Sequence, residues 1–152
     1  MNEIALALNS NEHITGWEQP EDRAPCYYVD ALGRVQRIIV NEHSKSQVDL
    51  LYSEANCYLS ENVASDIARA ERLIRKLRRE SIQRRQNQID LSNEGGYTIT
   101  YNYVDNCLEL GGTGNWLAVG DIVFDSEKSA QEVMNIYAEE LTWYFTRKRE
   151  TI

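Results

Sequence analysis

The stretch Val123-Phe124-Asp125-Ser126-Glu127-Lys128-Ser129-Ala130-Gln131-Glu132-Val133 has the pattern of a strand end, a serine cap and the first turns of an amphipathic helix. The same pattern occurs once before, in Cys57-Tyr58-Leu59-Ser60-Glu61-Asn62-Val63-Ala64-Ser65-Asp66-Ile67. A serine before a helix accepts a hydrogen bond from a backbone N–H of the first turn, and a glutamate is favoured at the positive end of the helix dipole. Both copies therefore predict a helix start rather than a chemical site.

A second internal similarity precedes each copy. The first strand of each predicted β-hairpin ends with a similar tripeptide, Tyr28-Val29-Asp30 or Tyr103-Val104-Asp105. In the first hairpin, Asp30 and Gly33 are the expected turn residues. The order hairpin, linker, strand and Ser-capped helix thus occurs twice, in pseudo-repeats at about 25–89 and 96–149 after an N-terminal lead-in at 1–24. Neither half can bury a face alone, so we expect one α+β domain over 1–152, with antiparallel strands and two amphipathic helices.

The expected helices differ in their apolar faces. After Ser60 one apolar stripe runs through Val63, Ile67, Ala70, Ile74 and Leu77. Ser81, Arg84 and Gln88 occupy the next positions, so the last two turns are expected to project or fray. After Ser126 one continuous helical face reaches Tyr144, while 41–49 is polar and predicts a loop.

Composition limits the possible functions. The chain has 152 residues, 42% hydrophobic, and a net charge of −8, which argues against general affinity for nucleic acid or anionic membrane. No run approaches the roughly 20 apolar residues that span a bilayer, and Ile4–Leu8 is too short for a signal core. Three widely spaced cysteines predict free thiols in a reducing cytoplasm. The two histidines show no metal-ligand spacing, and neither a metal nor a cofactor is expected.

The charge is most uneven within the first helix. Residues 69–85 carry +6 and the rest of the chain −14, which together give −8. The candidate binding residues on this helix are Arg69, Arg72, Arg75, Lys76, Arg79, Arg84 and Arg85. Such a face can contact an acidic protein, a second copy of the chain or a phosphate backbone. It can also be a solvated surface with internal pairs Glu71–Arg75 and Glu80–Arg84.

Aromatic residues offer a second candidate surface. Tyr27, Tyr101, Tyr103 and Trp116 are candidates for a groove that stacks a nucleobase, although strands also place tyrosines in cores. The glycines at 111–114 precede a predicted strand rather than a helix, which favours a turn or bulge over a phosphate loop. No motif indicates a nucleophile or a general acid–base pair, so we do not expect an enzyme.

The chain resembles a group of small proteins encoded by phages and prophages of Gram-positive bacteria. The similar elements are Trp17-x-x-Pro20 before Tyr27-Tyr28-Val29-Asp30-x-x-Gly33, the two aromatic-x-Ser-Glu-x-x-Ala motifs and the Tyr-rich strands. The resemblance extends from Trp17 to Phe145, and Ala55-Asn56 departs from it where Gly-Asn is expected. It implies an accessory phage protein, without catalytic residues, that acts against host defence.

These observations lead to one main hypothesis and two alternatives. The main hypothesis is a non-enzymatic, anti-CRISPR-like inhibitor that binds a host defence protein such as a CRISPR effector. The first alternative is a sponge that sequesters a nucleotide immune signal. The second is a DNA-binding regulator that uses the Arg-rich helix, although direct nucleic-acid binding is less favoured by the acidic net charge. A homo-oligomer remains a further option.

Overall fold

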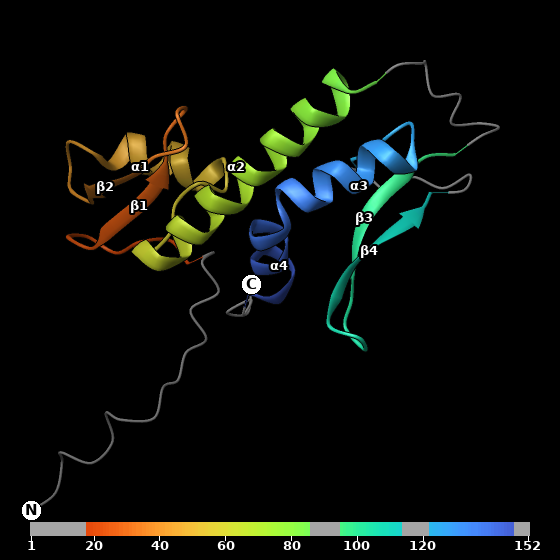
Figure 1. Ribbon diagram of the computed structural model, residues 1–152. Helices are drawn as coiled ribbons and strands as arrows, with labels where there is room; N and C mark the ends of the chain where they lie inside the picture. Colours follow the sequence, from red (N-terminus) through yellow and green to blue (C-terminus); the bar gives the residue numbers. More distant parts are fainter. Residues whose placement is uncertain (1–17, 86–94, 114–121, 148–152) are drawn as a thin grey trace, which may run out of the picture. The chain divides into compact units, whose positions relative to one another are not determined.

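The computed structural model describes residues 18–85, 95–113 and 122–147 (Figure 1). Within these ranges it contains four helices and two antiparallel two-stranded sheets, which confirms the α+β class. The elements are β1 (Pro25–Val29), β2 (Val35–Ile39), α1 (Lys45–Ser53), α2 (Glu61–Gln83), β3 (Tyr97–Asn102), β4 (Cys107–Gly112), α3 (Glu127–Ile136) and α4 (Ala138–Thr146).

The chain divides into two compact units, and the boundary falls within the sequence of α2, between Ala68 and Arg69. The first unit holds β1, β2, α1 and the start of α2, and the second holds the rest of α2 and the elements from β3 to α4. Each unit has the order hairpin, aromatic bridge, serine and helix. The internal duplication and the single-domain organisation stay predictions.

The hairpin of the first unit is closed by a carboxylate turn. Asp30 accepts hydrogen bonds from the backbone N–H groups of Leu32 and Arg34, both at 2.9 Å. Gly33 has a φ of 76°, which a glycine adopts without a Cβ penalty. Both turn residues expected from the sequence therefore have the predicted role.

Helix α1 corrects the prediction of a loop at 41–49. Val48 is buried, and Leu51 and Tyr52 pack beside it against the core of the first unit. These three residues have the 3–4 spacing of a helix face, but only Val48 lies within the segment expected to be a loop. Asn41 prepares the start of α1, because its side-chain oxygen accepts from the backbone N–H of His43 at 2.9 Å.

The segment between α1 and α2 is attached to β1 at two places. Tyr58 and Tyr27 exchange two backbone hydrogen bonds of 2.8 Å. The Asn56 side chain accepts from the Val29 N–H at 2.9 Å and donates to the Val29 carbonyl at 2.8 Å. The strand predicted at this motif is therefore one backbone bridge, between Tyr58 and Tyr27, and the Asn56 side chain adds two hydrogen bonds beside it.

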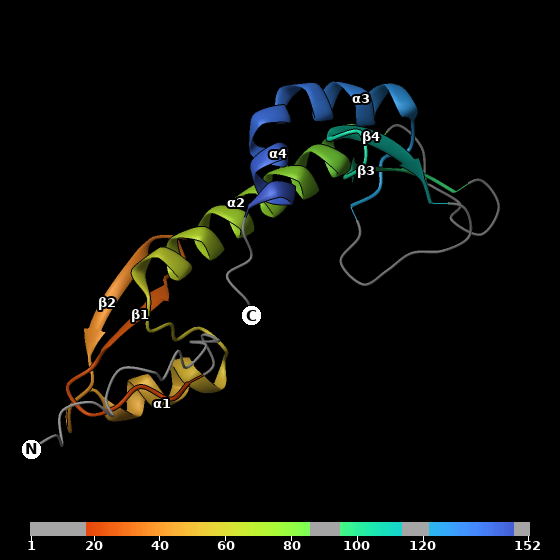
Figure 2. The same ribbon diagram turned by 90° about the horizontal axis from the view of Figure 1, so that it is seen from below.

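The second unit has the larger apolar core. Figures 1 and 2 show α3 beside the β3–β4 hairpin, and both α3 and α4 contact that hairpin. Phe124 is 2% exposed and exchanges backbone hydrogen bonds of 2.9 and 2.8 Å with Tyr97. Its bridge to β3 matches the Tyr58 bridge to β1. The buried residues of this core are Leu73, Leu77, Phe124, Ala130, Val133 and Leu141.

The buried positions of α2 differ from the predicted single stripe. Val63 and Ile67 are half-buried, whereas Ala64 and Ala68 are buried. The packed part also continues beyond Leu77: Ser81 is 7% exposed, and its hydroxyl donates to the Val123 carbonyl at 2.6 Å. The expected projection of the helix after Leu77 is therefore wrong at Ser81. The segment from 86 to 88 lies outside the described residues.

The last helix is interrupted, although a continuous one was expected. Tyr137 has φ −107° and ψ 19° and separates α3 from α4. The Tyr137 N–H still donates to the Val133 carbonyl at 3.1 Å, so the chain bends without losing this hydrogen bond. The Tyr137 hydroxyl donates to Glu80 of α2 at 3.3 Å. This contact, distant in sequence, accompanies the bend.

Candidate functional site

Three of the predicted basic residues are held in ion pairs within the second unit. Arg69 donates two hydrogen bonds, of 3.0 and 2.9 Å, to the carboxylate of Glu140 on α4. Its guanidinium also lies 3.9 Å from the ring centroid of Trp143, within the range of a cation–π contact. The hydrogen bond from Arg69 lowers the pKa of Glu140 below its ordinary value. Arg69 therefore fixes α4 to α2.

Arg75 and Arg84 form the two internal pairs expected from their spacing. Arg75 lies 3.5 Å from Glu71, and Arg84 lies 3.0 Å from Glu80. Arg84 also contacts Glu132 of α3. Hydrogen bonding to Glu80 raises the pKa of Arg84 above its ordinary value. Arg84 thus belongs to the packing between α2 and α3.

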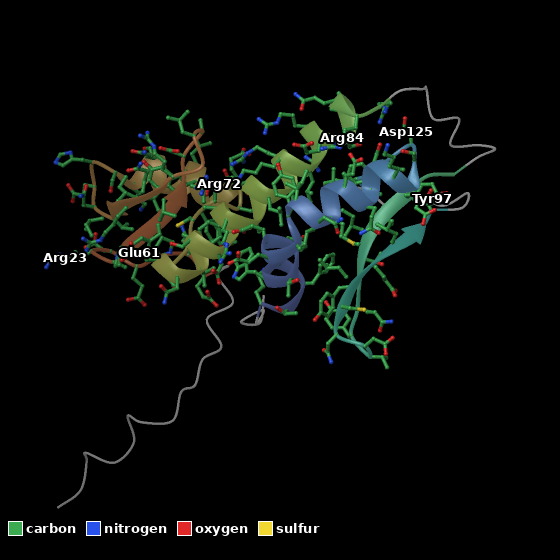
Figure 3. All side chains as sticks on the ribbon, viewed as in Figure 1. Arg23, Glu61, Arg72, Arg84, Tyr97 and Asp125 are labelled. Atoms are coloured by element: carbon green, nitrogen blue, oxygen red, sulfur yellow. The ribbon has the colours of Figure 1, made fainter. Side chains whose placement is uncertain are left out.

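Arg72, Lys76 and Arg79 form an exposed row on α2, which we call the basic row. Arg72 is labelled on α2 in Figure 3. Their spacing of four and three residues places them on one face, over about 10 Å of helix at 1.5 Å per residue. Arg78 and Arg85, at the end of the described segment, are exposed as well. The basic row is the part of the predicted basic surface whose three side chains are all exposed to solvent.

An exposed isoleucine accompanies these cations. Ile82 is 68% exposed and lies three residues after Arg79 and four after Arg78. Helical geometry makes both arginines its neighbours on the surface. Arginine is enriched at protein interfaces, and an exposed apolar side chain beside it provides surface that a partner can bury. The sequence signal was available, because Ile82 falls outside the apolar stripe of α2, but the prediction did not use it.

The predicted aromatic groove is only partly assembled. Tyr101 and Tyr103 pack together with ring centroids 5.0 Å apart, and Tyr101 stacks on Phe145 at 5.9 Å. The Tyr103 hydroxyl donates to the Phe145 carbonyl at 3.0 Å. Tyr27 lies in the first unit, where it pairs with Tyr58, and residue 116 lies outside the described residues.

An open cavity lies in the described part of each unit. The cavity of the second unit, about 210 Å³, is lined by apolar and aromatic side chains together with Thr98, and no arginine or lysine lines it. It therefore has no group that would neutralise a phosphate. The cavity of the first unit, about 350 Å³, is polar, and Asp22, Glu42, Asp49 and Lys45 are among its lining residues.

The described residues contain neither a metal-binding cluster nor a membrane-spanning helix. No cluster of three or more His, Cys, Asp or Glu side chains suited to a metal ion occurs in the described ranges. No helix in those ranges is long and apolar enough to cross a membrane. Comparisons of the chain with protein-family models, curated proteins and solved structures found no match.

Proposed function

We propose that the protein is a non-enzymatic binding protein of the phage accessory type, which inhibits a bacterial anti-phage defence protein. The contact surface is the basic row of α2 together with Ile82. The exposed position of Arg72, Lys76 and Arg79 on one helix face is the observation that carries this proposal. The defence-related context is supported by the resemblance to phage proteins described above.

The charge distribution favours an acidic protein surface over nucleic acid as the partner. The basic row covers only about two helical turns, whereas residues outside 69–85 carry a charge of −14. The Debye length at 0.1 M salt is about 10 Å, so acidic residues within that distance of a long phosphate backbone would repel it. A compact acidic patch on a protein can meet the row and avoid the remaining surface.

The apolar anchor is needed for affinity. Exposed ion pairs contribute about 0–1 kcal/mol each, so three cations alone give weak binding. Their larger effect is on the association rate and on the choice of partner. Burying Ile82 in a pocket contributes about 1.5–3 kcal/mol. We therefore expect the partner to have an apolar pocket bordered by carboxylates.

Phage plating on strains that each carry one defence system tests the proposal. Expression of the protein should restore plaque formation on a strain whose defence effector it binds. Reversing the basic row with Arg72→Glu, Lys76→Glu and Arg79→Glu should abolish this effect. A matched control reverses three exposed acidic residues of the first unit, Asp22→Lys, Glu42→Lys and Asp49→Lys, and should remain active.

The same variants distinguish the competing outcomes. If the acidic-residue variant loses activity and the basic-row variant keeps it, the proposed surface is wrong. If no defence effector is affected or co-purifies, the proposed function is wrong. A gel shift with duplex DNA that weakens steeply with salt would instead indicate a DNA-binding regulator. A large thermal shift with a cyclic nucleotide would indicate a sponge.

A further inference from the structure

Two cysteines share the core of the first unit. Cys26 on β1 is 0% exposed, and Cys57, just before α2, is 3% exposed. Both belong to the cluster that also contains Val40 and Val48. Both are free thiols. Their burial in one small cluster brings together two side chains that are distant in sequence.

The backbone places the two cysteine side chains on the same face. The Tyr58–Tyr27 bridge and the Asn56–Val29 hydrogen bonds align the segment 56–58 antiparallel to β1. Cys57 therefore lies opposite Tyr28, and Cys26 is a diagonal neighbour of Cys57. Because side chains alternate between faces along a strand, residues 26, 28 and 57 share one face. Diagonal neighbours of an antiparallel pair lie about 7–8 Å apart, slightly beyond the roughly 4.4–6.8 Å between the Cα atoms of a disulfide. Closing a bond between Cys26 and Cys57 therefore requires a small approach of the two backbone segments.

We propose that Cys26 and Cys57 are a redox-active pair that closes a reversible disulfide. The oxidant is a low-molecular-weight disulfide such as oxidised glutathione. The Cys57 thiolate attacks one sulfur of the oxidant, forming a mixed disulfide and releasing one glutathione thiolate. The deprotonated Cys26 then attacks Cys57 Sγ, forming the Cys26–Cys57 bond and releasing the second glutathione thiolate. The two cysteines lose two electrons and two protons, and the oxidant is reduced to two thiols.

The environment of the pair sets its rate of reaction. Burial, together with the neighbouring Cys26 thiol, raises the pKa of Cys57 to about 12. The thiolate is the attacking species, so oxidation is slow at neutral pH and accelerates as the pH rises. Burial also requires the first unit to open locally before the oxidant reaches the pair. The device thus responds to sustained oxidation rather than to brief exposure.

The expected consequence is a more stable first unit. The disulfide ties β1 to the segment that leads into α2 and closes the chain between residues 26 and 57. Closing a loop of about 30 residues reduces the conformational freedom of the unfolded chain. For a chain of 152 residues this corresponds to a rise in Tm of roughly 10 °C.

The test uses the full chain with the exposed Cys107 replaced, Cys107→Ser. The protein is incubated with oxidised glutathione over a range of pH and analysed by intact mass spectrometry and thermal unfolding. We expect a product that has lost two hydrogen atoms, carries no glutathione and unfolds at higher temperature. Dithiothreitol should reverse both changes. The rate should rise about tenfold per pH unit below the thiol pKa.

Two results would overturn the proposal. One is the accumulation of glutathione adducts on both cysteines without an intramolecular bond. The other is an intramolecular bond that leaves Tm unchanged or lowers it. The double variant Cys26→Ser, Cys107→Ser should show at most one glutathione adduct and no oxidation-dependent rise in Tm. If that variant does not fold, Cys26→Ala, Cys107→Ser serves the same purpose, and the Cys107→Ser readouts are decisive by themselves.

Discussion

The two units attach the segment before a helix to a hairpin in the same way but stabilise the attachment differently. In the second unit the bridging aromatic, Phe124, is 2% exposed at the centre of a large apolar core. In the first unit the equivalent Tyr58 is half-buried, and the core beside it contains the small residues Cys26, Val48 and Cys57. The first unit adds the two hydrogen bonds of Asn56 to Val29.

This difference shows what a shared motif determines. The pattern aromatic-x-Ser-Glu-x-x-Ala gives each unit one backbone bridge and one helix start, which are local features. Whether the aromatic ring is a core residue depends on the elements around it. We therefore expect the attachment in the second unit to depend mainly on apolar burial, and that in the first unit mainly on polar contacts.

The largest expected effect is that of Phe124→Ala. Removing a fully buried phenylalanine should lower the free energy of unfolding of the second unit by about 3–5 kcal/mol. The matched variant Tyr58→Ala should cost clearly less, because that side chain is only half-buried. Hydrogen exchange of the β3 and β1 amides measures each unit separately. Equal losses of protection would contradict the proposed difference between the units.

Asn56→Ala should produce the next largest effect, in the first unit. It leaves the N–H and carbonyl of Val29 without their side-chain partner, which costs about 1–3 kcal/mol. Amide exchange at Val29 should accelerate first. The control is Thr113→Val in the second unit, where the hydroxyl accepts from the Gly96 N–H at 2.7 Å. If Thr113→Val lowers the free energy of unfolding of its unit more than Asn56→Ala does, the first unit does not depend on polar contacts more than the second.

Local features were the ones that the sequence predicted. The hairpin turn at Asp30, the starts of α2 and α3 and the Glu80–Arg84 pair each depend on residues at most four apart. Alternation, capping and helical spacing encode such features directly. The basic row followed from the same spacing rule.

Features made by distant residues were missed. Arg69 was expected on the binding face, but it is held by Glu140, 71 positions later, and by Trp143. Ser81 was expected to project, but it is buried because the Val123 carbonyl accepts its hydroxyl. Helix α1 has too short an apolar face to stand out from a polar segment. None of these contacts leaves a periodic signal in the sequence.

Ser126→Ala tests the helix start of the second unit. The Ser126 hydroxyl oxygen accepts from the Ser129 N–H at 3.2 Å, so the predicted cap is confirmed and its loss should cost about 0.5–2 kcal/mol. At Ser60 the backbone carbonyl accepts a hydrogen bond from the Ala64 N–H at 3.1 Å, and an alanine at this position keeps that bond. Ser60→Ala should therefore lower Tm less than Ser126→Ala. The reverse order would show that the caps do not differ as described.

Ala55→Gly should have a smaller effect of opposite sign. Ala55 has a φ of 53°, in the left-handed region that glycine adopts without steric cost. This explains why a glycine was expected before Asn56. The substitution should stabilise the first unit by up to about 1 kcal/mol, as the relieved strain exceeds the added freedom of the unfolded chain. The opposite change, Gly33→Ala at φ 76°, should destabilise the same unit in urea unfolding.

The smallest effect concerns acid, because the carboxylate involved lies at an exposed turn. The backbone hydrogen bond from Arg34 is the main cause that lowers the pKa of Asp30 from 3.8 to about 2. A carboxyl with a lowered pKa in the folded state stabilises the protein above its unfolded pKa, and this contribution disappears as the pH falls from about 4 to 2. The urea midpoint of the first unit should therefore decrease over this range. In the Asp30→Asn variant the urea midpoint should decrease less between about pH 4 and pH 2. If the pH dependence of the midpoint is unchanged in this variant, groups other than Asp30 cause the acid sensitivity.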